Sequence, residues 1–289
     1  MKGFEKINQY IYHLNPRGNM LGGITLVLGK SKFLIDCGAS DSVVTEHLAP
    51  ALKELGYSIK NIDYVLFTHC HPENIGGAHK LRSLLSSSAR VMAYGKQADK
   101  LKNPTYYLAK ACNLYPDYDL PFREIKGILP DGLANEENLI FGELYPISAP
   151  GHDDDCVCWY HIESKTLIAG DAVQCNGTKS TGIAYYNNLK SYKTTLKDLT
   201  SNLEISTMIC SGAYFENSNL IRGSDKCTAA LQQSYSFIEN YQSFVDLYIR
   251  GKRLKRDHAR VEDIAKSYFE NREKPESLAY SMITFSEHI

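Results

Sequence analysis

The chain has 289 residues, of which 43% are hydrophobic and 22% are charged, and its formal net charge is -1. This is the composition of an ordinary globular protein that can bury a sizeable core, and a charge so close to zero gives no reason to expect nucleic acid or an anionic membrane as a partner. No run approaches the length of a membrane span and the N-terminus lacks the apolar core of a signal peptide, so we expect a cytoplasmic protein without a membrane partner.

The N-terminal part of the chain predicts alternating strands and helices. Apolar runs at 23–29 and 32–37 flank Lys30-Ser31, which is a hairpin signal. Apolar residues at three- to four-residue spacing then predict a helix over 44–55, which Pro50 either kinks or starts. The runs that follow predict a buried strand at 62–67, a short helix around Leu81, Leu84 and Leu85, and a strand at 90–94.

Aromatic residues and prolines crowd the stretch 104–122. Aromatic loops often form pocket walls, so one interpretation is a short helical insertion over a cleft. Packing of an ordinary connection explains the same residues, and both interpretations stay open.

The remainder of the chain predicts further strands and then helices only. Strand signals return at 138–148, 156–162 and 166–169, a helix follows at 189–203, and a short strand follows at 207–210. Beyond about 224 every pattern is helical. We therefore expect a layered α/β domain at 1–224 and a helical C-terminal extension at 225–289 packed on it.

Two features of the extension allow a second interpretation. Six lysines and arginines gather between Arg250 and Arg260; a solvated linker between helices is expected, and contact with an anionic substrate or RNA is the alternative. Tyr235, Tyr241 and Tyr248 recur on one side of a helix. We expect them to pack on the domain, although the same face could form a homodimer contact.

The eight cysteines are scattered and include no Cys-x-x-Cys pair, so a zinc ribbon is not expected. Without an export signal, free thiols in a reducing compartment are the default.

The most informative segment is Thr68-His69-Cys70-His71-Pro72-Glu73-Asn74-Ile75-Gly76-Gly77, which directly follows a predicted buried strand. Two histidines two positions apart, with a carboxylate two further on, are typical of a loop that binds a metal. A strand end holds such ligands on a rigid scaffold and leaves one side open to water and substrate, which a hydrolytic metal requires.

Two more candidate ligands follow predicted strands in the same way. His152 ends Ala149-Pro150-Gly151-His152, and Asp171 follows the strand that ends near Gly170. One histidine alone would be a weak signal, but four such groups at successive strand ends are hard to attribute to packing. Imidazoles with a carboxylate favour Zn²⁺, Fe²⁺ or Mn²⁺ over Ca²⁺ or Mg²⁺.

These segments resemble those of the metallo-β-lactamase superfamily in their order and spacing. The resemblance spans about residues 8 to 215 and includes Asp36-Cys37-Gly38, the loop from Thr68 to Gly77, and the segments that end at His152 and Asp171. It implies an αββα sandwich with two sheets back to back, and a metal site at one edge. It also implies that His69, His71 and His152 bind a first metal and that Asp171 bridges to a second.

The second metal site departs from the family pattern. The family loop reads His-x-His-x-Asp-His, but here Glu73 and Asn74 occupy the last two positions, and Ala213 stands where a final histidine would be expected. Alanine donates nothing, and Glu73 extends its carboxylate by about 1.5 Å, which is large against a ligand-distance tolerance of about 0.2 Å. We therefore predict one metal, most simply Zn²⁺, with Fe or Mn as alternatives. The expected ligands are His69, His71 and His152. Asp171 is a fourth ligand or a partner of the bound water, and Glu73 is a base or an outer partner of the site.

The leading hypothesis is a hydrolase that uses a metal-bound water on a small acyl, thioester or lactone substrate, because phosphodiester cleavage leans more on a two-metal clamp. A second hypothesis is a mononuclear iron oxygenase resembling persulfide dioxygenases, which would use His69, His152 and Asp171. A third is a binding protein without turnover. Asp153, Asp154 and Asp155 could add a ligand or anchor a shifted second ion, although an exposed acidic turn explains them as well.

Overall fold

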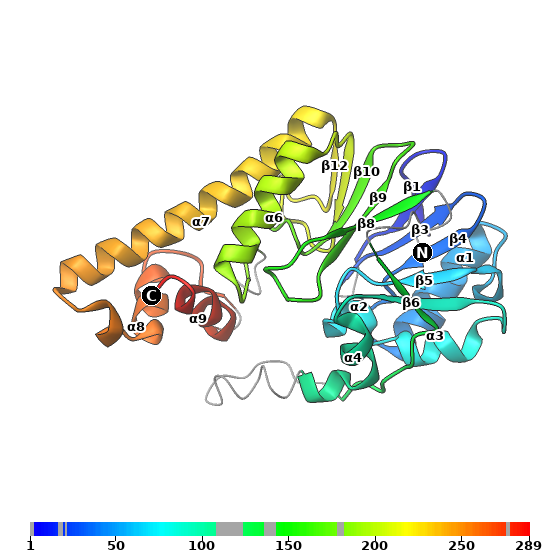
Figure 1. Ribbon diagram of the computed structural model, residues 1–289, viewed down its shortest axis with the longest axis horizontal. Coiled ribbons are helices and arrows are strands. Elements are labelled where there is room, and N and C mark those ends of the chain that lie inside the picture. Colours follow the sequence, from blue (N-terminus) through cyan, green and yellow to red (C-terminus); the bar gives the residue numbers. More distant parts are fainter. Residues whose placement is uncertain are drawn as a thin grey trace.

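The computed structural model describes residues 3–16, 20, 22–107, 124–135, 143–177, 182–275 and 278–289. Within these ranges the chain forms two β-sheets with helices on their outer faces, which is the predicted αββα sandwich, followed by C-terminal helices (Figure 1). Much of the stretch 104–122 and part of the predicted strand at 138–148 lie outside the described residues.

The first sheet has seven strands in chain order, from β1 to β7. The predicted hairpin is β3 and β4, which pair antiparallel, whereas β4, β5, β6 and β7 pair parallel. The strands are β1 Glu5–Lys6, β2 Ile11–Leu14, β3 Ile24–Leu28, β4 Lys32–Ile35, β5 Tyr64–Leu66, β6 Arg90–Tyr94 and β7 Gly132–Ala134.

The second sheet has five strands in the order β12-β11-β10-β9-β8. Only β10 and β11 pair parallel, and α6 connects them. The strands are β8 Leu144–Ser148, β9 Val157–His161, β10 Thr166–Gly170, β11 Thr207–Cys210 and β12 Leu220–Arg222.

Helices cover the outer face of each sheet. On the first sheet the predicted helix is a π-helix, η2, that continues as α1. Pro50 lies where the π-helix changes to the α-helix, and proline cannot donate a regular backbone hydrogen bond at this position. The elements on this side are η2 Val43–Leu48, α1 Ala49–Glu54, η3 Ile59–Asn61, α2 Pro72–Ile75, α3 Ala78–Leu84 and α4 Gln97–Lys102. On the second side they are α6 Leu189–Asn202, α7 Ser224–Lys252, η4 Arg256–His258, α8 Val261–Tyr268 and α9 Leu278–Ser286.

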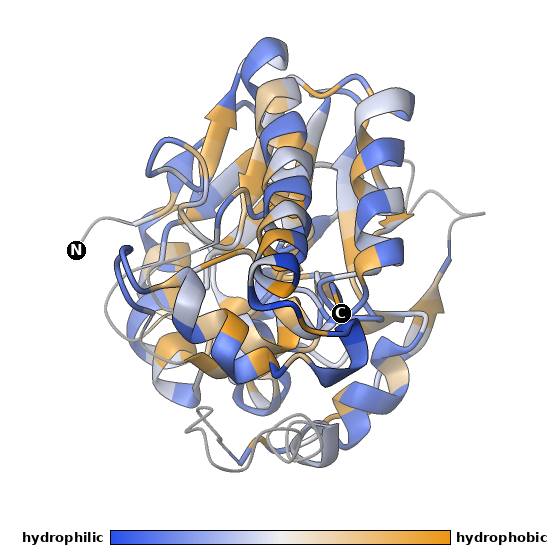
Figure 2. Cartoon of the chain, turned by 90° about the vertical axis from the view of Figure 1, so that its left-hand side faces the viewer, coloured by the Kyte–Doolittle hydropathy of each residue, from blue (hydrophilic) through white to orange (hydrophobic). Residues whose placement is uncertain are grey.

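The apolar side chains form three layers of core, as a four-layer architecture requires. One cluster fills the space between the sheets and includes Phe33, Trp159 and Ile168. A second lies between the first sheet and its helices, and a third joins the second sheet to α6, α7, α8 and α9. The helices on the extension side carry both hydrophobic and hydrophilic residues (Figure 2), as expected when one face packs and the other meets water.

Two expectations about the extension can be compared with this packing. Tyr241 is fully buried, and Tyr235 and Tyr248 are half-buried against the same cluster, so this face of α7 packs on the domain. The basic stretch forms the end of α7, the connection through η4 and the start of α8, where Arg256 forms an ion pair with Asp246.

The seven described cysteines are free thiols, and all are buried. Within the described ranges the model contains no helix with the length and apolar character that a bilayer crossing demands.

Candidate metal centre

The predicted ligands follow three strands whose ends meet. His69 and His71 come shortly after β5, His152 comes after β8, and Asp171 directly follows β10. The turn from β10 to Asp171 depends on Gly170, which has a φ of +56°. A Cβ added to this residue would lie 2.6 Å from the Cβ of Thr68. Only glycine tolerates both the positive φ and this approach, so β10 can deliver Asp171 directly beside the histidine loop.

The three imidazoles lie around one point. Their ring centroids are 4.6 to 4.8 Å apart, and His71 Nδ1 is 3.0 Å from His152 Nε2. Asp171 Oδ2 is 3.5 Å from His69 Nε2 and 3.7 Å from His152 Nε2. Two nitrogens bound to one tetrahedral Zn²⁺ at about 2.05 Å would be about 3.3 Å apart, so these separations suit a shared cation.

His152 has one ring nitrogen occupied by the protein and the other directed at the cluster. Its Nδ1 lies 3.0 Å from the carbonyl oxygen of Tyr185, to which an Nδ1–H can donate. The Gln174 amide nitrogen lies 2.9 Å from the same Nδ1, but its two hydrogens can be donated to the Tyr185 and Asp171 carbonyls, so Nδ1 can keep its own hydrogen. This tautomer leaves the lone pair of His152 Nε2 for a metal.

His69 is held by a chain of buried polar groups. Its Nδ1 lies 3.2 Å from Thr68 Oγ1 and 2.9 Å from the Asn74 amide nitrogen, and Thr68 Oγ1 donates to Asp36. The opposite nitrogen, Nε2, is buried without a hydrogen-bond partner in the described part of the chain. A buried nitrogen without a partner is costly unless a cation occupies the position in front of it, so the donor set fits a metal.

His71 is oriented by a carboxylate and a buried lysine. Its Nε2 lies 3.4 Å from Asp153 Oδ2, and the Lys100 ammonium lies 2.7 Å from the same oxygen. Lys100 also pairs with Asp154 and Asp155. Asp155 is buried, so the interpretation of the three aspartates as an exposed acidic turn is wrong for it. Lys100 offsets part of the negative charge of the three carboxylates, and Asp153 turns Nδ1 of His71 toward the other imidazoles.

The surroundings shift the pKa values of these groups in opposite directions. Burial, followed by the charge of His71, lowers the pKa of His152 to about 4, and burial also lowers the pKa of His69 well below its usual value. Burial alone would lower the pKa of His71, but Asp153 and Glu73 outweigh it and raise that pKa to about 9. At neutral pH two of the imidazoles therefore offer lone pairs, and the third must lose a proton before it can bind a cation.

Asp171 is fixed by Tyr214, which follows Ala213, the residue at the position where the family pattern has its final histidine. Tyr214 donates its hydroxyl proton to Asp171 Oδ1 at 2.6 Å, which leaves Oδ2 to face His69 and His152. Ala213 itself is exposed and carries no ligand atom. The loop after β11 thus positions the carboxylate through Tyr214.

The structure, like the sequence, lacks the histidine ligands of a second metal position. Asn74 is buried, and its amide nitrogen donates to Thr68 Oγ1 and lies against His69. Its side-chain oxygen faces the backbone of Gly22. Glu73 remains at the cluster, 3.9 Å from His71 Nδ1, and can form a group with His69 and Asp171.

All five predicted site residues therefore lie together. Several residues that hold them in place could not be predicted from the sequence. Lys100, Gln174, Tyr185 and Tyr214 reach the site from other elements, and no local motif marks them. The only sequence signal was position: Gln174 follows Asp171 by three residues, and Tyr214 follows Ala213.

Comparison with known proteins agrees with this fold. Residues 23–211 match the profile of the Metallo-beta-lactamase superfamily. A metallo-beta-lactamase family protein of Thermus thermophilus superposes with a TM-score of 0.70 over 98% of this chain and 94% of that one, at 18% identity. A B3 metallo-beta-lactamase described as the first with an active-site glutamic acid superposes with a TM-score of 0.59 over 83% of this chain and 90% of that one, at 16% identity.

Among sequence relatives, the ribonuclease Z of Clostridium kluyveri is 38% identical over 76 residues, which are 26% of this chain and 22% of that protein. The chain thus spans only about a fifth of the length of this relative. The family profile, by contrast, covers well over half of the chain and includes every candidate ligand. This protein belongs to the metallo-β-lactamase superfamily.

Proposed function

We propose that this protein is a single-metal hydrolase that acts on a small acyl, thioester or lactone substrate. The observation that carries the proposal is the convergence of three imidazoles and one carboxylate at a point where Asn74 is turned away into a buried hydrogen-bond network. The first site keeps its three histidines and the second has lost its own, which favours chemistry that needs only one ion.

Each residue has a proposed role at this site. His69, His71 and His152 would hold the cation, and Asp171 would be a fourth ligand or would accept a hydrogen bond from water. A bound Zn²⁺ would supply Lewis acidity and lower the pKa of water to about 7. Glu73, whose side chain is 30% exposed, would take up the proton. The B3 relative shows that a protein of this fold can carry an active-site glutamic acid.

The substrate class follows from the missing second ion. Phosphodiester cleavage uses two ions to hold the attacking and leaving oxygens, whereas acyl transfer needs one polarising centre. The similarity to ribonuclease Z covers too little of either chain to carry that activity over.

The test is a substrate panel with the zinc-loaded protein. We expect hydrolysis of aryl esters, thioesters or lactones, little hydrolysis of bis(p-nitrophenyl) phosphate, and loss of activity in His152→Ala. Full activity in the metal-free protein would refute the proposal.

An iron oxygenase is the second candidate, and one observation favours it. His69, His152 and Asp171 form a two-histidine, one-carboxylate set, while the raised pKa of His71 keeps a proton on the third imidazole at neutral pH. Anaerobic purification followed by elemental analysis, and oxygen uptake with glutathione persulfide, separate this candidate from the hydrolase.

A further inference from the structure

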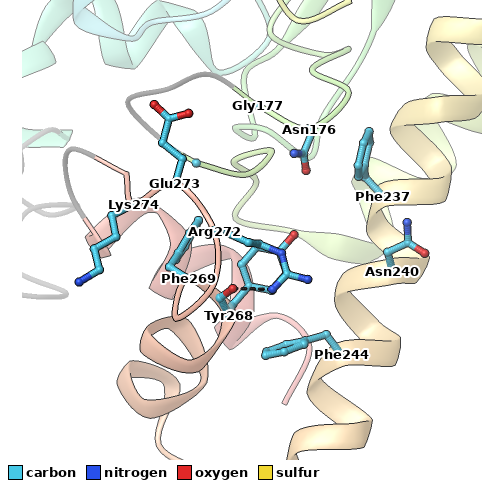
Figure 3. Close-up of a pocket in the computed structure, with 11 residues that line it drawn as sticks. Asn176, Gly177, Phe237, Asn240, Phe244, Tyr268, Phe269, Arg272, Glu273 and Lys274 are labelled. Atoms are coloured by element: carbon cyan, nitrogen blue, oxygen red, sulfur yellow. Dashed lines mark hydrogen bonds between the residues drawn. The ribbon is translucent and has the colours of Figure 1, made fainter.

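A cavity of about 660 Å³ lies between α7, the end of α8 and the segment after β10, and it contains none of the candidate metal ligands (Figure 3). Its volume is within the range of small-molecule sites. It is lined by Asn176, Gly177, Gly182, Phe237, Asn240, Phe244, Tyr268, Phe269, Arg272, Glu273 and Lys274.

Aromatic rings line two walls of this cavity. Phe237, Asn240 and Phe244 are spaced at i, i+3 and i+7, so they share one face of α7. Tyr268 and Phe269 line the opposite wall at the end of α8 (Figure 3). The rings of Phe244 and Tyr268 contact each other edge to face, with centroids 5.0 Å apart, so a flat aromatic molecule can pack only beside this pair, against Phe237 or Phe269.

Gly182 closes the cavity on a third side. Its φ is +71°, and a Cβ there would lie 2.8 Å from the ring of Phe269, so the backbone can approach this ring only because the residue is glycine. The wall is therefore specified by the sequence at this point.

The cation of Arg272 stacks on the wall that the end of α8 forms. The guanidinium carbon of Arg272 is 4.3 Å from the ring centre of Tyr268 and 6.0 Å from that of Phe244, and Nη1 donates to the Tyr268 carbonyl at 2.6 Å. Among the described residues no partner is found for its other N–H groups. In Figure 3 the side chains of Glu273 and Lys274 extend away from this guanidinium. A guanidinium fixed by stacking, with donors to spare, is suited to a carboxylate or sulfonate.

We propose that this cavity binds a small aromatic anion, with its ring packed against Phe237 or Phe269 and its anionic group on Arg272. The site is distinct from the metal centre and does not depend on the proposed hydrolysis.

Two fluorescent probes that differ in charge test the proposal. 1-Anilinonaphthalene-8-sulfonate carries an anion, and N-phenyl-1-naphthylamine has the same rings without it. We expect the intact protein to bind the sulfonate about tenfold more tightly than the neutral probe, as a charge-assisted hydrogen bond implies. Arg272→Gln should abolish this preference and leave the neutral probe unaffected, while Phe237→Ala should weaken the binding of both probes.

Controls separate the cavity from other sites. Arg250→Gln removes an exposed cation of α7 that does not line the cavity, and His152→Ala removes a candidate metal ligand; both should bind the probes as the unaltered protein does. If the two probes bind equally, if Arg272→Gln has no effect, or if His152→Ala abolishes sulfonate binding, the assignment is wrong. Should Phe237→Ala fail to fold, Arg272→Gln, at an exposed position, still tests the proposal.

Discussion

Asn74 stands where the family pattern has a metal-binding histidine, and in this chain it stabilises a neighbouring ligand instead. Its buried amide nitrogen donates to Thr68 Oγ1, to which an Nδ1–H of His69 can also donate, and Thr68 in turn donates to Asp36. The same position thus lowers the capacity for a second ion and orients the imidazole that serves the first. Outer contacts of this kind tune the affinity of a site for its metal.

We expect Asn74→Ala to weaken Zn²⁺ binding by about 10- to 100-fold, because Thr68, the hydroxyl partner of His69 Nδ1, would lose the hydrogen bond that fixes it. Competition with a chromogenic chelator measures the affinity. Asn240→Ala, at an exposed position that lines the separate cavity beside α7 and not the metal centre, is the matched control and should bind Zn²⁺ normally. Equal affinity in the two variants would contradict the orienting role.

The raised pKa of His71 should make metal binding depend on pH. Its pKa is raised to about 9 by Asp153 and Glu73 against the effect of burial, so in the metal-free protein it holds a proton below that pH. A metal must displace this proton, so affinity should rise with pH up to about 9 and then level off. Calorimetry at pH 7 in buffers of different ionisation enthalpy should show release of about one proton per metal bound. No release at pH 7 would show that His71 is neutral or does not bind.

Among the helices and strands, α9 has an unexpected connection to the metal centre. Thr284 is fully buried; its hydroxyl donates to the Ala184 carbonyl and accepts from the Tyr186 N–H. Between these two residues lies Tyr185, whose carbonyl faces His152 and whose ring packs against that of Tyr280 on α9. The C-terminal helix therefore supports the segment that orients a candidate ligand.

Thr284→Val should lower the free energy of unfolding by about 1–3 kcal/mol, because it leaves a buried carbonyl and a buried N–H without their hydroxyl partner. It should also weaken metal binding, whereas Thr284→Ser keeps the hydroxyl and should retain both properties. Thermal unfolding and a chelator competition measure the two effects. A destabilised Thr284→Val protein with unchanged metal affinity would limit α9 to a packing role.

The elements that could be predicted from sequence are those with a strong local pattern. The hairpin of β3 and β4, the buried β5 and β6, and α6 were all marked by apolar periodicity and turn residues. The strands β1, β2, β7 and β12 were missed, because no apolar run bounded by turn residues marks them and distant partners define them. Lys100 was missed for a similar reason. The ligands follow predicted strands, whereas Lys100 is recognised only by its partner Asp155, which is 55 positions away.

Over the full chain, the extension and the second sheet share one apolar cluster. Tyr241, Ile238 and Phe285 are fully buried within it. We therefore propose that 225–289 completes the domain at 1–224 and does not fold as a separate unit.

A chain truncated after Gly223 should be insoluble or lack a cooperative thermal transition, because it would expose the outer face of the second sheet. The full chain should unfold in a single transition, monitored by circular dichroism and by fluorescence of Trp159 between the sheets. Two separate transitions, or a folded truncated protein, would show that the extension is an independent domain.

The central claim is that this fold holds one catalytic ion between His69, His71, His152 and Asp171. The most direct measurement is a titration of the metal-free protein with Zn²⁺, in which bound metal and hydrolytic activity are followed together. We predict that both saturate at one equivalent per chain and that His152→Ala shows neither. Activity that appears only at the second equivalent, or that persists without metal, would contradict this account.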